Sequence, residues 1–423
     1  MASVFSLPRE PTAGPDVTSW YYQRIEASSA LNENQLAGAT VRFRIEPQGR
    51  HWFLPNRSYF RIRYELDEDG AGTAQTAVTP TMGFGGNLVK TMDVRVGGQT
   101  VSQVNVNMAQ IDAIHNRSKR AGIWLSSTGD EANRWSSNYP ASRIALDTLR
   151  KAQEVVWQPP LGFFQVSHAL PGMMYDIGMT INPNYERDCV TAVNNAIVVP
   201  NVDYKIRIKE ISFQACFAAG PRGDDEKFVL NIDEWSAQIQ PISASGTDTL
   251  KQFDVSPTTN VLAIALQDTR ISDNRVSASR FRILGTVPNT NDPNDAALAL
   301  RQYYLEYGGQ QFPRRFADPV YSAAAFQTAQ EVIGTQLQTG TYFLSGGGEN
   351  TSDFYARGAF YFHQVARDAT SQSTRVHVHT TFDQNYNNVG VILFARAPKA
   401  YLIRSSDSRV VQVEGAMTGS RGN

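Results

Sequence analysis

The sequence is poor in cysteine, and neither sign of charge is in excess. It has only two cysteines, Cys189 and Cys216, in 423 residues, which excludes a disulfide framework and any zinc module built on clustered cysteines. Lys and Arg number 39 and Asp and Glu 40, for a formal net charge of −1. Because phosphate binding needs an excess of positive charge, this balance argues against packaging of nucleic acid and against a sequence-specific nucleic-acid partner. One bridge between Cys189 and Cys216 stays open, and the apolar run Ile211–Phe217 favours two free buried thiols.

Long hydrophobic runs are also missing. No stretch reaches the ~18 apolar residues of a membrane span, so no transmembrane segment is expected. The first residues, Met1–Arg9, lack the basic and apolar regions of a signal peptide. We therefore expect a soluble, non-secreted protein made in a reducing compartment, and the sequons at Asn56, Asn116 and Asn350 are explained by chance.

The chain lacks the common catalytic motifs, among them the nucleophile elbow, the Walker A loop and the His-Glu-x-x-His helix. The run Gly346–Gly348 is not followed by a lysine, and it is read as a flexible loop rather than a phosphate cradle. The acidic cluster Asp224–Glu226 is expected to solvate a linker rather than to bind a cation. The sequence therefore predicts no catalytic, cofactor-binding or metal-binding residue, no cofactor and no enzyme activity.

Six histidines are present, and His377 and His379 are the most suggestive pair. Positions i and i+2 of a strand share a face, but a metal would need a third ligand. Val376 and Val378 alternate with them, which places the two histidines on the polar face. A solvated or interface role is favoured over a metal site.

The dominant local pattern is strict alternation of apolar and polar residues, which predicts half-buried antiparallel strands. It is clearest in Val41–Glu46, Phe60–Leu66, Met92–Val96 and Tyr204–Lys209. Arginines on these strands alternate with acidic residues, so their outward faces are expected to be solvated rather than to bind nucleic acid. The arginines are Arg42, Arg44, Arg61, Arg63 and Arg95, and the acids are Glu46, Glu65 and Asp93.

Each half of the chain shows the same succession of a glycine-rich hairpin and a short helix. Gly97-Gly98 precedes a helix that Asn107 would cap with Gln110, with Met108, Ile111 and Ile114 at helical spacing. Gly308-Gly309 precedes a second helix over 323–337, whose stripe is Phe326, Ala329, Ile333 and Leu337.

A chain of this length exceeds the ~250–300 residues of one core, and the duplicated succession predicts two antiparallel β-sandwiches of about eight strands each. Gly, Pro and Asp residues mark a linker between them. The predicted boundaries are an N-terminal arm at 1–16, a first sandwich at 17–217, a linker at 218–225, a second sandwich at 226–412 and a C-terminal arm at 413–423.

In order, these features resemble the double jelly-roll major capsid proteins of tailless icosahedral double-stranded DNA viruses, such as polinton-like viruses, virophages and nucleocytoplasmic large DNA viruses. Individually weak motifs carry the resemblance through their order over residues 17–412. Similar stretches are Phe53–Arg63, Asn87–Val101, Val156–Phe164 with Leu170-Pro171, Tyr175–Ile181, Tyr303–Pro313, Ala356–Phe362 and Val391–Arg396. The chain departs from the family's aromatic-Asp-Leu strand at Phe362–Val365.

The resemblance implies a structural protein of the virion, with two upright eight-stranded jelly rolls and short helices in loops. It implies that three chains form a pseudo-hexameric capsomer that tiles the shell beside neighbouring capsomers, penton proteins and minor capsid proteins. Contact with an internal membrane stays open. The two arms are expected to become ordered on contact with neighbours.

Four stretches without sustained periodicity are expected to supply intersubunit contacts or the outer surface. They are 70–86, 120–150, 185–200 and 270–298, and they contain Phe84, Trp124, Trp135 and Val198. The alternative function is a β-sandwich that binds or processes carbohydrate, for which tryptophans would stack on sugar rings. Core packing is favoured for each of the candidate tryptophans, which are Trp52, Trp124, Trp135 and Trp157. A single-roll minor shell protein is disfavoured by the length.

Overall fold

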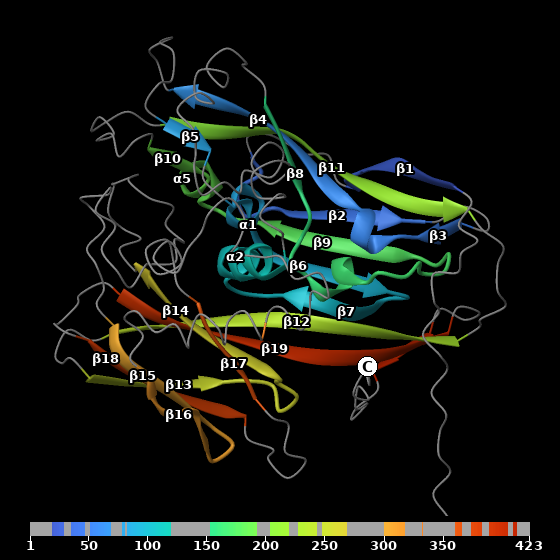
Figure 1. The fold of residues 1–423 in the computed structure, drawn as a ribbon. Coiled ribbons are helices and arrows are strands. Elements are labelled where there is room, and N and C mark those ends of the chain that lie inside the picture. The colour runs from blue at the N-terminus through green and yellow to red at the C-terminus, as the bar shows by residue number, and fades with distance from the viewer. Residues whose placement is uncertain are drawn as a thin grey trace, which may run out of the picture.

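The computed structural model describes residues 19–28, 35–46, 51–68, 78–80, 83–119, 153–192, 204–219, 227–242, 248–268, 300–317, 332, 360–365, 374–382, 389–404 and 409–412. Strands dominate on both sides of residue 220 (Figure 1). The strands before it are β1 (Ser19–Glu26), β2 (Thr40–Ile45), β3 (His51–Phe53), β4 (Tyr59–Glu68), β5 (Val78–Pro80), β6 (Val89–Val96), β7 (Gln99–Val104), β8 (Gln153–Trp157), β9 (Tyr175–Ile181), β10 (Val190–Ala192) and β11 (Tyr204–Ala219).

The described residues of the same half also form short helical segments. They are η2 (Pro55–Arg57), α1 (Phe84–Leu88), α2 (Met108–Lys119), η4 (Gly162–Gln165) and α5 (Tyr185–Asp188). The strands after residue 226 are β12 (Lys227–Pro241), β13 (Asp248–Asp254), β14 (Val261–Asp268), β15 (Leu300–Tyr307), β16 (Gln310–Ala317), β17 (Tyr361–Gln364), β18 (Arg375–Phe382), β19 (Val389–Arg404) and β20 (Arg409–Gln412).

The strand order is the same in both halves. The first half forms the sheets β1-β11-β4-β8 and β2-β9-β6-β7, and the second forms β12-β19-β14-β17 and β13-β18-β15-β16. When the accessory strands β3, β5, β10 and β20 are left out, the described residues of each half form eight strands. Numbered along the chain, they have the order 1-8-3-6 in one sheet and 2-7-4-5 in the other. All named strand pairs are antiparallel, and each joins strands of one half. This is the jelly-roll arrangement twice over, as predicted.

Local sequence explains several of these elements. In β2 exposed and buried residues alternate strictly, with Val41, Phe43 and Ile45 buried. The hairpin β6–β7 turns at Gly97 and Gly98, whose φ angles are +55° and +84°, and β15–β16 turns at Gly308 and Gly309, at +59° and +75°. Two successive positive φ angles define the tight turn that matches strand twist, and glycine adopts them at the lowest cost. The predicted hairpins are confirmed.

The four large sheets are stacked, with the first half above the second in Figure 1. Sheet β12-β19-β14-β17 lies inside the stack. All residues of Val261–Gln267 and Val389–Ala397 are buried, so these strands lack the alternation of half-exposed strands. One continuous hydrophobic cluster extends through both jelly rolls.

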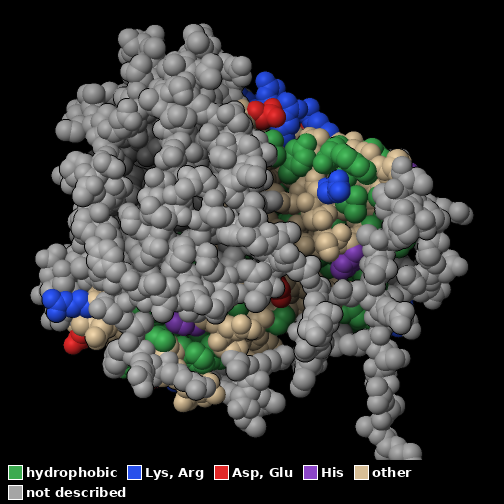
Figure 2. Space-filling model, viewed as in Figure 1, with side chains coloured by type: hydrophobic (Ala, Val, Ile, Leu, Met, Phe, Trp, Pro, Cys, Tyr) green, Lys and Arg blue, Asp and Glu red, His purple; other side chains and the backbone are tan. Residues whose placement is uncertain are grey.

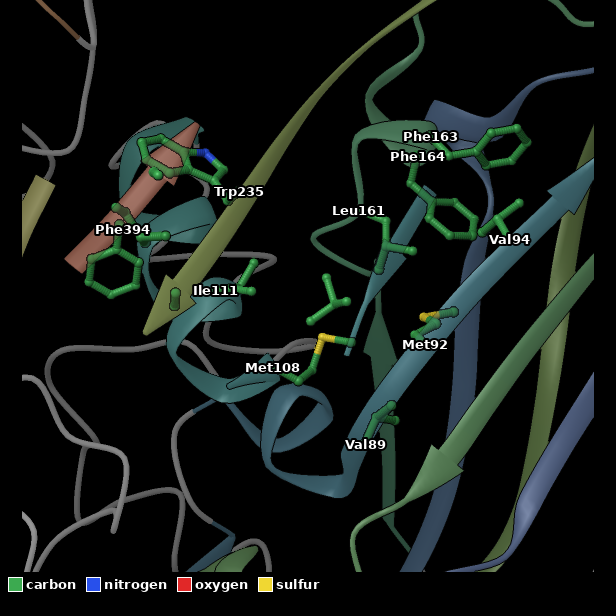
Figure 3. Packing of buried hydrophobic residues seen from close by; sticks show 14 of the residues in the cluster. Val89, Met92, Val94, Met108, Ile111, Leu161, Phe163, Phe164, Trp235 and Phe394 are labelled. Atoms are coloured by element: carbon green, nitrogen blue, oxygen red, sulfur yellow. The ribbon is translucent and has the colours of Figure 1, made fainter. Parts of the chain in front are cut away.

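The seam between the rolls is built from α2, β7 and η4 of the first roll against β12 of the second, and a hydrogen bond from Gln110 to Gln267 joins α2 to β14. Met108 and Ile111 of α2, Leu161 next to η4 and Trp235 of β12 lie in the same packed region (Figure 3). Gly162 approaches β12 so closely that a Cβ there would overlap the Ile232 side chain and the Asp233 carbonyl oxygen.

The α2 helix exists as predicted, but the Asn107 and Gln110 side chains do not form the predicted N-terminal cap. They bind other partners instead. Asn107 has a φ of +58°, and its Nδ2 donates to the Ala237 carbonyl oxygen at 2.7 Å. Gln110 Nε2 donates to Gln267 Oε1 at 3.0 Å. Both side chains therefore bind the second roll. Of the second predicted helix, 323–337, only Val332 lies within the described residues, where it is helical and buried.

Candidate functional site

The predicted histidine pair lies on one face of β18, beside an acid. His377 Nδ1 is 3.6 Å and His379 Nε2 is 3.9 Å from the same Glu306 oxygen. The His379 ring stacks on Tyr304 with centroids 4.0 Å apart. Burial lowers the pKa of His379, while Glu306 acts in the opposite direction. Among the described residues no set of three or more His, Cys, Asp or Glu side chains is placed to hold a metal ion.

A different histidine is buried in the second roll. His363 of β17 lies 2.9 Å, Nε2 to hydroxyl oxygen, from Tyr303. Desolvation lowers the pKa of His363 to about 4, so the imidazole is neutral at physiological pH and its ring nitrogen pairs with the tyrosine. This contact holds the packing of β17 against β15 in place.

The two cysteines are free and buried. Burial raises the pKa of both thiols, and that of Cys189 is raised well above its usual value. A protonated, buried thiol is a poor nucleophile and a poor ligand. The structure thus has the two free thiols that the apolar run around Cys216 favoured.

Two of the three sequons fall within the described residues. Asn116 is buried in α2, where Nδ2 donates to the Asp112 carbonyl oxygen at 2.9 Å and to Asp112 Oδ1 at 3.0 Å. Trp157 Nε1 donates to the same carboxylate oxygen at 3.1 Å. Asn116 therefore serves internal packing. Asn350, Gly346–Gly348 and Asp224–Glu226 lie outside the described residues.

The five arginines weighed as a basic face lie on two different sheets, and four of them are paired with acids. Arg61 Nε is 2.6 Å from Glu154 Oε2, and Arg95 Nε is 2.8 Å from Asp93 Oδ2. Arg44 lies 3.5 Å from Asp176, and Arg63 lies 3.5 Å from Glu210. These faces carry alternating charge, as the sequence predicted, and offer no continuous positive surface among the described strands.

The predicted contact loops are only partly described, and one of their residues has a different role. Phe84, offered as a loop residue for intersubunit contact, is fully buried at the start of α1 and stacks on Tyr64, with ring centroids 4.9 Å apart. That expectation was wrong for Phe84, because a short helix within the stretch turns its ring into the core. Residues 120–150 and 270–298, with Trp124 and Trp135, and Val198 lie outside the described residues.

Of the four tryptophans that were weighed as sugar platforms, the two that the structure describes, Trp52 and Trp157, do not form an aromatic cleft. Trp157 is 2 % exposed, in the core of the first roll. Trp52 is partly buried against a small cluster with Leu54. Within the described residues no helix is long and apolar enough to cross a membrane.

Sequence reasoning missed one feature of the surface. Trp20, Tyr21 and Tyr22 of β1 are consecutive aromatic residues, and each is more than a third exposed. A run of three aromatic residues is visible in the sequence, but its exposure is not, because a strand with aromatic side chains on both faces reads as an interior strand.

Comparison with known proteins identifies the fold. No known family model and no curated protein sequence matches the chain. A chain of the Sputnik virophage structure is 12% identical with a TM-score of 0.61, and the match covers 99% of this chain and 94% of that one. The fold is a double jelly roll. The mavirus major capsid protein is 8% identical with a TM-score of 0.58, and the match covers 98% of this chain and 93% of that one. The Faustovirus major capsid protein is 8% identical with a TM-score of 0.55, and the match covers 95% of this chain and 92% of that one.

Proposed function

We propose that this protein is the major capsid protein of an icosahedral double-stranded DNA virus and works as a structural, non-enzymatic component of the virion. The supporting observation is that one chain carries two jelly rolls of identical strand order, packed through one continuous core. Full-length similarity to the mavirus and Faustovirus capsid proteins agrees with it. Such a rigid unit with two similar halves suits tiling, in which three copies present six similar rolls around one axis.

The finer parts of the proposal are the homotrimer and its contacts with neighbouring capsomers, penton proteins and minor capsid proteins. The division into arms at 1–16 and 413–423, rolls at 17–217 and 226–412 and a linker at 218–225 belongs to the same proposal. Strand β11 continues to Ala219, two residues past the proposed end of the first roll at 217, and β12 begins at Lys227, so the linker is shorter at its start than proposed.

The deciding experiment is size-exclusion chromatography with light scattering on the purified chain, followed by electron microscopy of the eluted species. A stable trimer with a hexagonal outline supports the proposal. A monomer at all concentrations that binds a sugar on a glycan array would overturn it in favour of the carbohydrate-binding alternative.

A further inference from the structure

The seam between the two rolls contains a buried charge. Glu234 of β12 is only 7% exposed, and β12 is the strand of the second roll that α2, β7 and η4 of the first roll contact. Glutamates are almost never buried to this degree unless they are paired, because an ion loses its hydration on leaving water. The partners of Glu234 therefore decide what it does at the seam.

Glu234 binds one group from each roll. Its Oε1 accepts a hydrogen bond of 3.0 Å from the backbone N–H of Gln103 in β7. Its Oε2 is paired with the Lys399 ammonium group of β19, which lies in the same sheet as β12. A single carboxylate thus connects the first roll to a cation of the second.

A tyrosine of the second roll lies near the same carboxylate. Tyr401 is two residues beyond Lys399, on the same face of β19, and it is 3% exposed. Burial, and to a smaller extent the negative charge of Glu234, raise the pKa of Tyr401 to about 12. The hydroxyl therefore stays neutral and adds no second negative charge beside Glu234.

The amide that Glu234 binds belongs to the edge of a sheet. β7 is the last strand of β2-β9-β6-β7, and an edge strand has a row of N–H and C=O groups without a strand partner. Gln103 is paired with Asp93 of β6 on one side, and its N–H donates across the seam to Glu234 on the other. The carboxylate of one roll takes the place of a neighbouring strand for the other.

Other contacts of the described seam are apolar or neutral. Met108, Ile111 and Leu161 pack there (Figure 3), and the hydrophobic attraction between such side chains has no direction along a strand. Asn107 and Gln110 donate hydrogen bonds across the seam as neutral amides. Because an unpaired buried charge costs more than an unpaired neutral group, Glu234 opposes sliding of the rolls most strongly.

A single register along β12 brings this carboxylate to Gln103. Residues two apart on a strand share a face, so a slip of two residues would bring Ile232 or Ser236 to the place of Glu234. A slip of one residue would turn the opposite face of the strand toward β7. In every slipped register Glu234 stays buried without its amide donor, and Gln103 loses its acceptor.

We propose that Glu234 is a positioning residue that sets the register of the first roll against the second. A buried ion pair adds little net stability, because the cost of desolvation offsets most of the Coulomb attraction, and its best-attested role is to select one register. Glu234 therefore decides less whether the rolls associate than where β12 lies along β7. This inference goes beyond the proposed function, since it concerns contacts within one chain.

The test measures the offset between the rolls with spin labels on two exposed residues. Val106, 58% exposed, lies in the first roll, and Val411, 46% exposed, lies on β20 of the second. The V106C/V411C chain is labelled with nitroxides and diluted into unlabelled chain, so that double electron–electron resonance reads distances within one chain. The chain without these two substitutions gives the background from the native cysteines, which are both buried.

Three further variants are compared on this labelled background. E234L/K399M removes the whole ion pair, whereas E234Q keeps an oxygen that accepts the Gln103 N–H. K209M/E65L is the matched control, because it removes a Lys–Glu pair, 3.3 Å apart, that joins β11 to β4 within the first roll. Lys and Arg side chains gather over these two strands on the visible surface (Figure 2). The unmodified chain, E234Q and K209M/E65L should each give one narrow distance distribution.

E234L/K399M is expected to stay folded by circular dichroism, with a melting temperature no lower than that of K209M/E65L, and to show a second distance. A slip of two residues displaces one roll along the other by about 7 Å, so the second peak should lie up to that far from the first. A folded E234L/K399M with only the distance of the unmodified chain would overturn the inference. A second distance in K209M/E65L as well would also overturn it.

If E234L/K399M does not fold, Q103P decides. Proline removes the amide donor from an edge strand, where it is tolerated, and leaves both charges of the ion pair in place. Q103P should then show the second distance, and a single unchanged distance would contradict the proposed role of Glu234. These measurements do not depend on assembly of the chain, so the proposed function is tested separately.

Discussion

The two jelly rolls have the same strand order but fill their interiors with different side chains. In the first roll aromatic rings dominate: Phe53 lies 5.1–6.5 Å, ring centroid to centroid, from four others, namely Phe163, Tyr175, Phe213 and Phe217. In the second roll, β14 and the first half of β19 contribute runs of small and branched residues, Val261–Leu266 and Val389–Leu393. Strand order therefore does not depend on which apolar residues fill the core, provided that the core volume is filled.

The two rolls also differ in how many faces they bury. The first roll keeps the alternation of half-exposed strands, as in β2 and β6, whereas β14 and the first part of β19, Val389–Ala397, are buried on both faces. The cause is what covers the sheet β12-β19-β14-β17: α2 and η4 of the first roll contact β12, and Gln110 of α2 bonds Gln267 of β14. The seam is thus a second core, and the following changes test how far it makes the two rolls one unit.

The largest effect is expected from G162V. A side chain at this position overlaps Ile232 and the Asp233 carbonyl, so η4 has to move away from β12. We expect the free energy of unfolding to fall by about 3 kcal/mol or more, which is at the upper end for overpacking. We also expect the single thermal unfolding transition of the unmodified chain to become two transitions in the variant, because the two rolls separate.

Differential scanning calorimetry measures both the stability of G162V and the number of its thermal transitions, with G38A as control. Gly38 has open space around it but a φ of +74°, so G38A isolates backbone strain, at about 1 kcal/mol. Equal losses for both variants would show that the seam is not the sensitive contact.

The second effect concerns acid stability and arises in the second roll. The pKa of His363 is about 4 when folded, against ~6.5 when unfolded. A depressed histidine pKa means that the unfolded chain binds the proton more tightly, so stability is complete above pH 6.5 and falls as pH drops toward 4.

We expect protonation of His363 to lower the free energy of unfolding by on the order of 3 kcal/mol between pH 6.5 and pH 4. Urea unfolding at pH 7.5 and 4.5 should show a smaller pH dependence for H363Q, which keeps a partner for the Tyr303 hydroxyl. An unchanged dependence would remove His363 from the explanation.

The third effect concerns the polar contact across the seam. Gln110 and Gln267 are both buried and joined by one hydrogen bond of 3.0 Å. Because Q110L leaves a buried polar partner with one hydrogen bond fewer, it should cost about 1–3 kcal/mol. The double variant Q110L/Q267L should cost less than the sum of the single changes, as measured by a double-mutant cycle. Strict additivity would mean that the two side chains do not act together.

The smallest effect is expected on the outer sheet of the first roll. Arg61 and Glu154 form an ion pair at 2.6 Å, but both side chains are more than a third exposed. Solvent screening limits such a pair to under about 1 kcal/mol. R61Q should therefore lower the melting temperature only slightly, and less still at 0.5 M salt. A loss comparable to that of Q110L would show that this face is buried in the assembled state.

Much of the fold was readable from the sequence, because alternation and glycine turns are local. The alternation of Val41, Phe43 and Ile45 and the Gly97-Gly98 turn predicted β2 and the β6–β7 hairpin correctly. The role of Phe84 was not readable, since a five-residue helix has too few positions for a periodic pattern. The partners of Asn107 and Gln110 were not readable either, because both lie more than a hundred residues away along the chain.

The sequence by itself determined the class of structure: two successive sets of antiparallel strands, with no charge excess to attract nucleic acid. Those properties follow from composition and from contacts between near neighbours in the chain. Only the tertiary structure decided which sheet faces are covered. Trp20 lies in β1 beneath Arg57, and Trp235 lies in β12 beneath Arg396. Each strand is the first of its roll, yet Trp235 is buried and Trp20 is exposed. The reason is that burial depends on what is stacked against a face: the first roll covers the 1-8-3-6 sheet of the second roll, whereas the second roll does not cover the 1-8-3-6 sheet of the first.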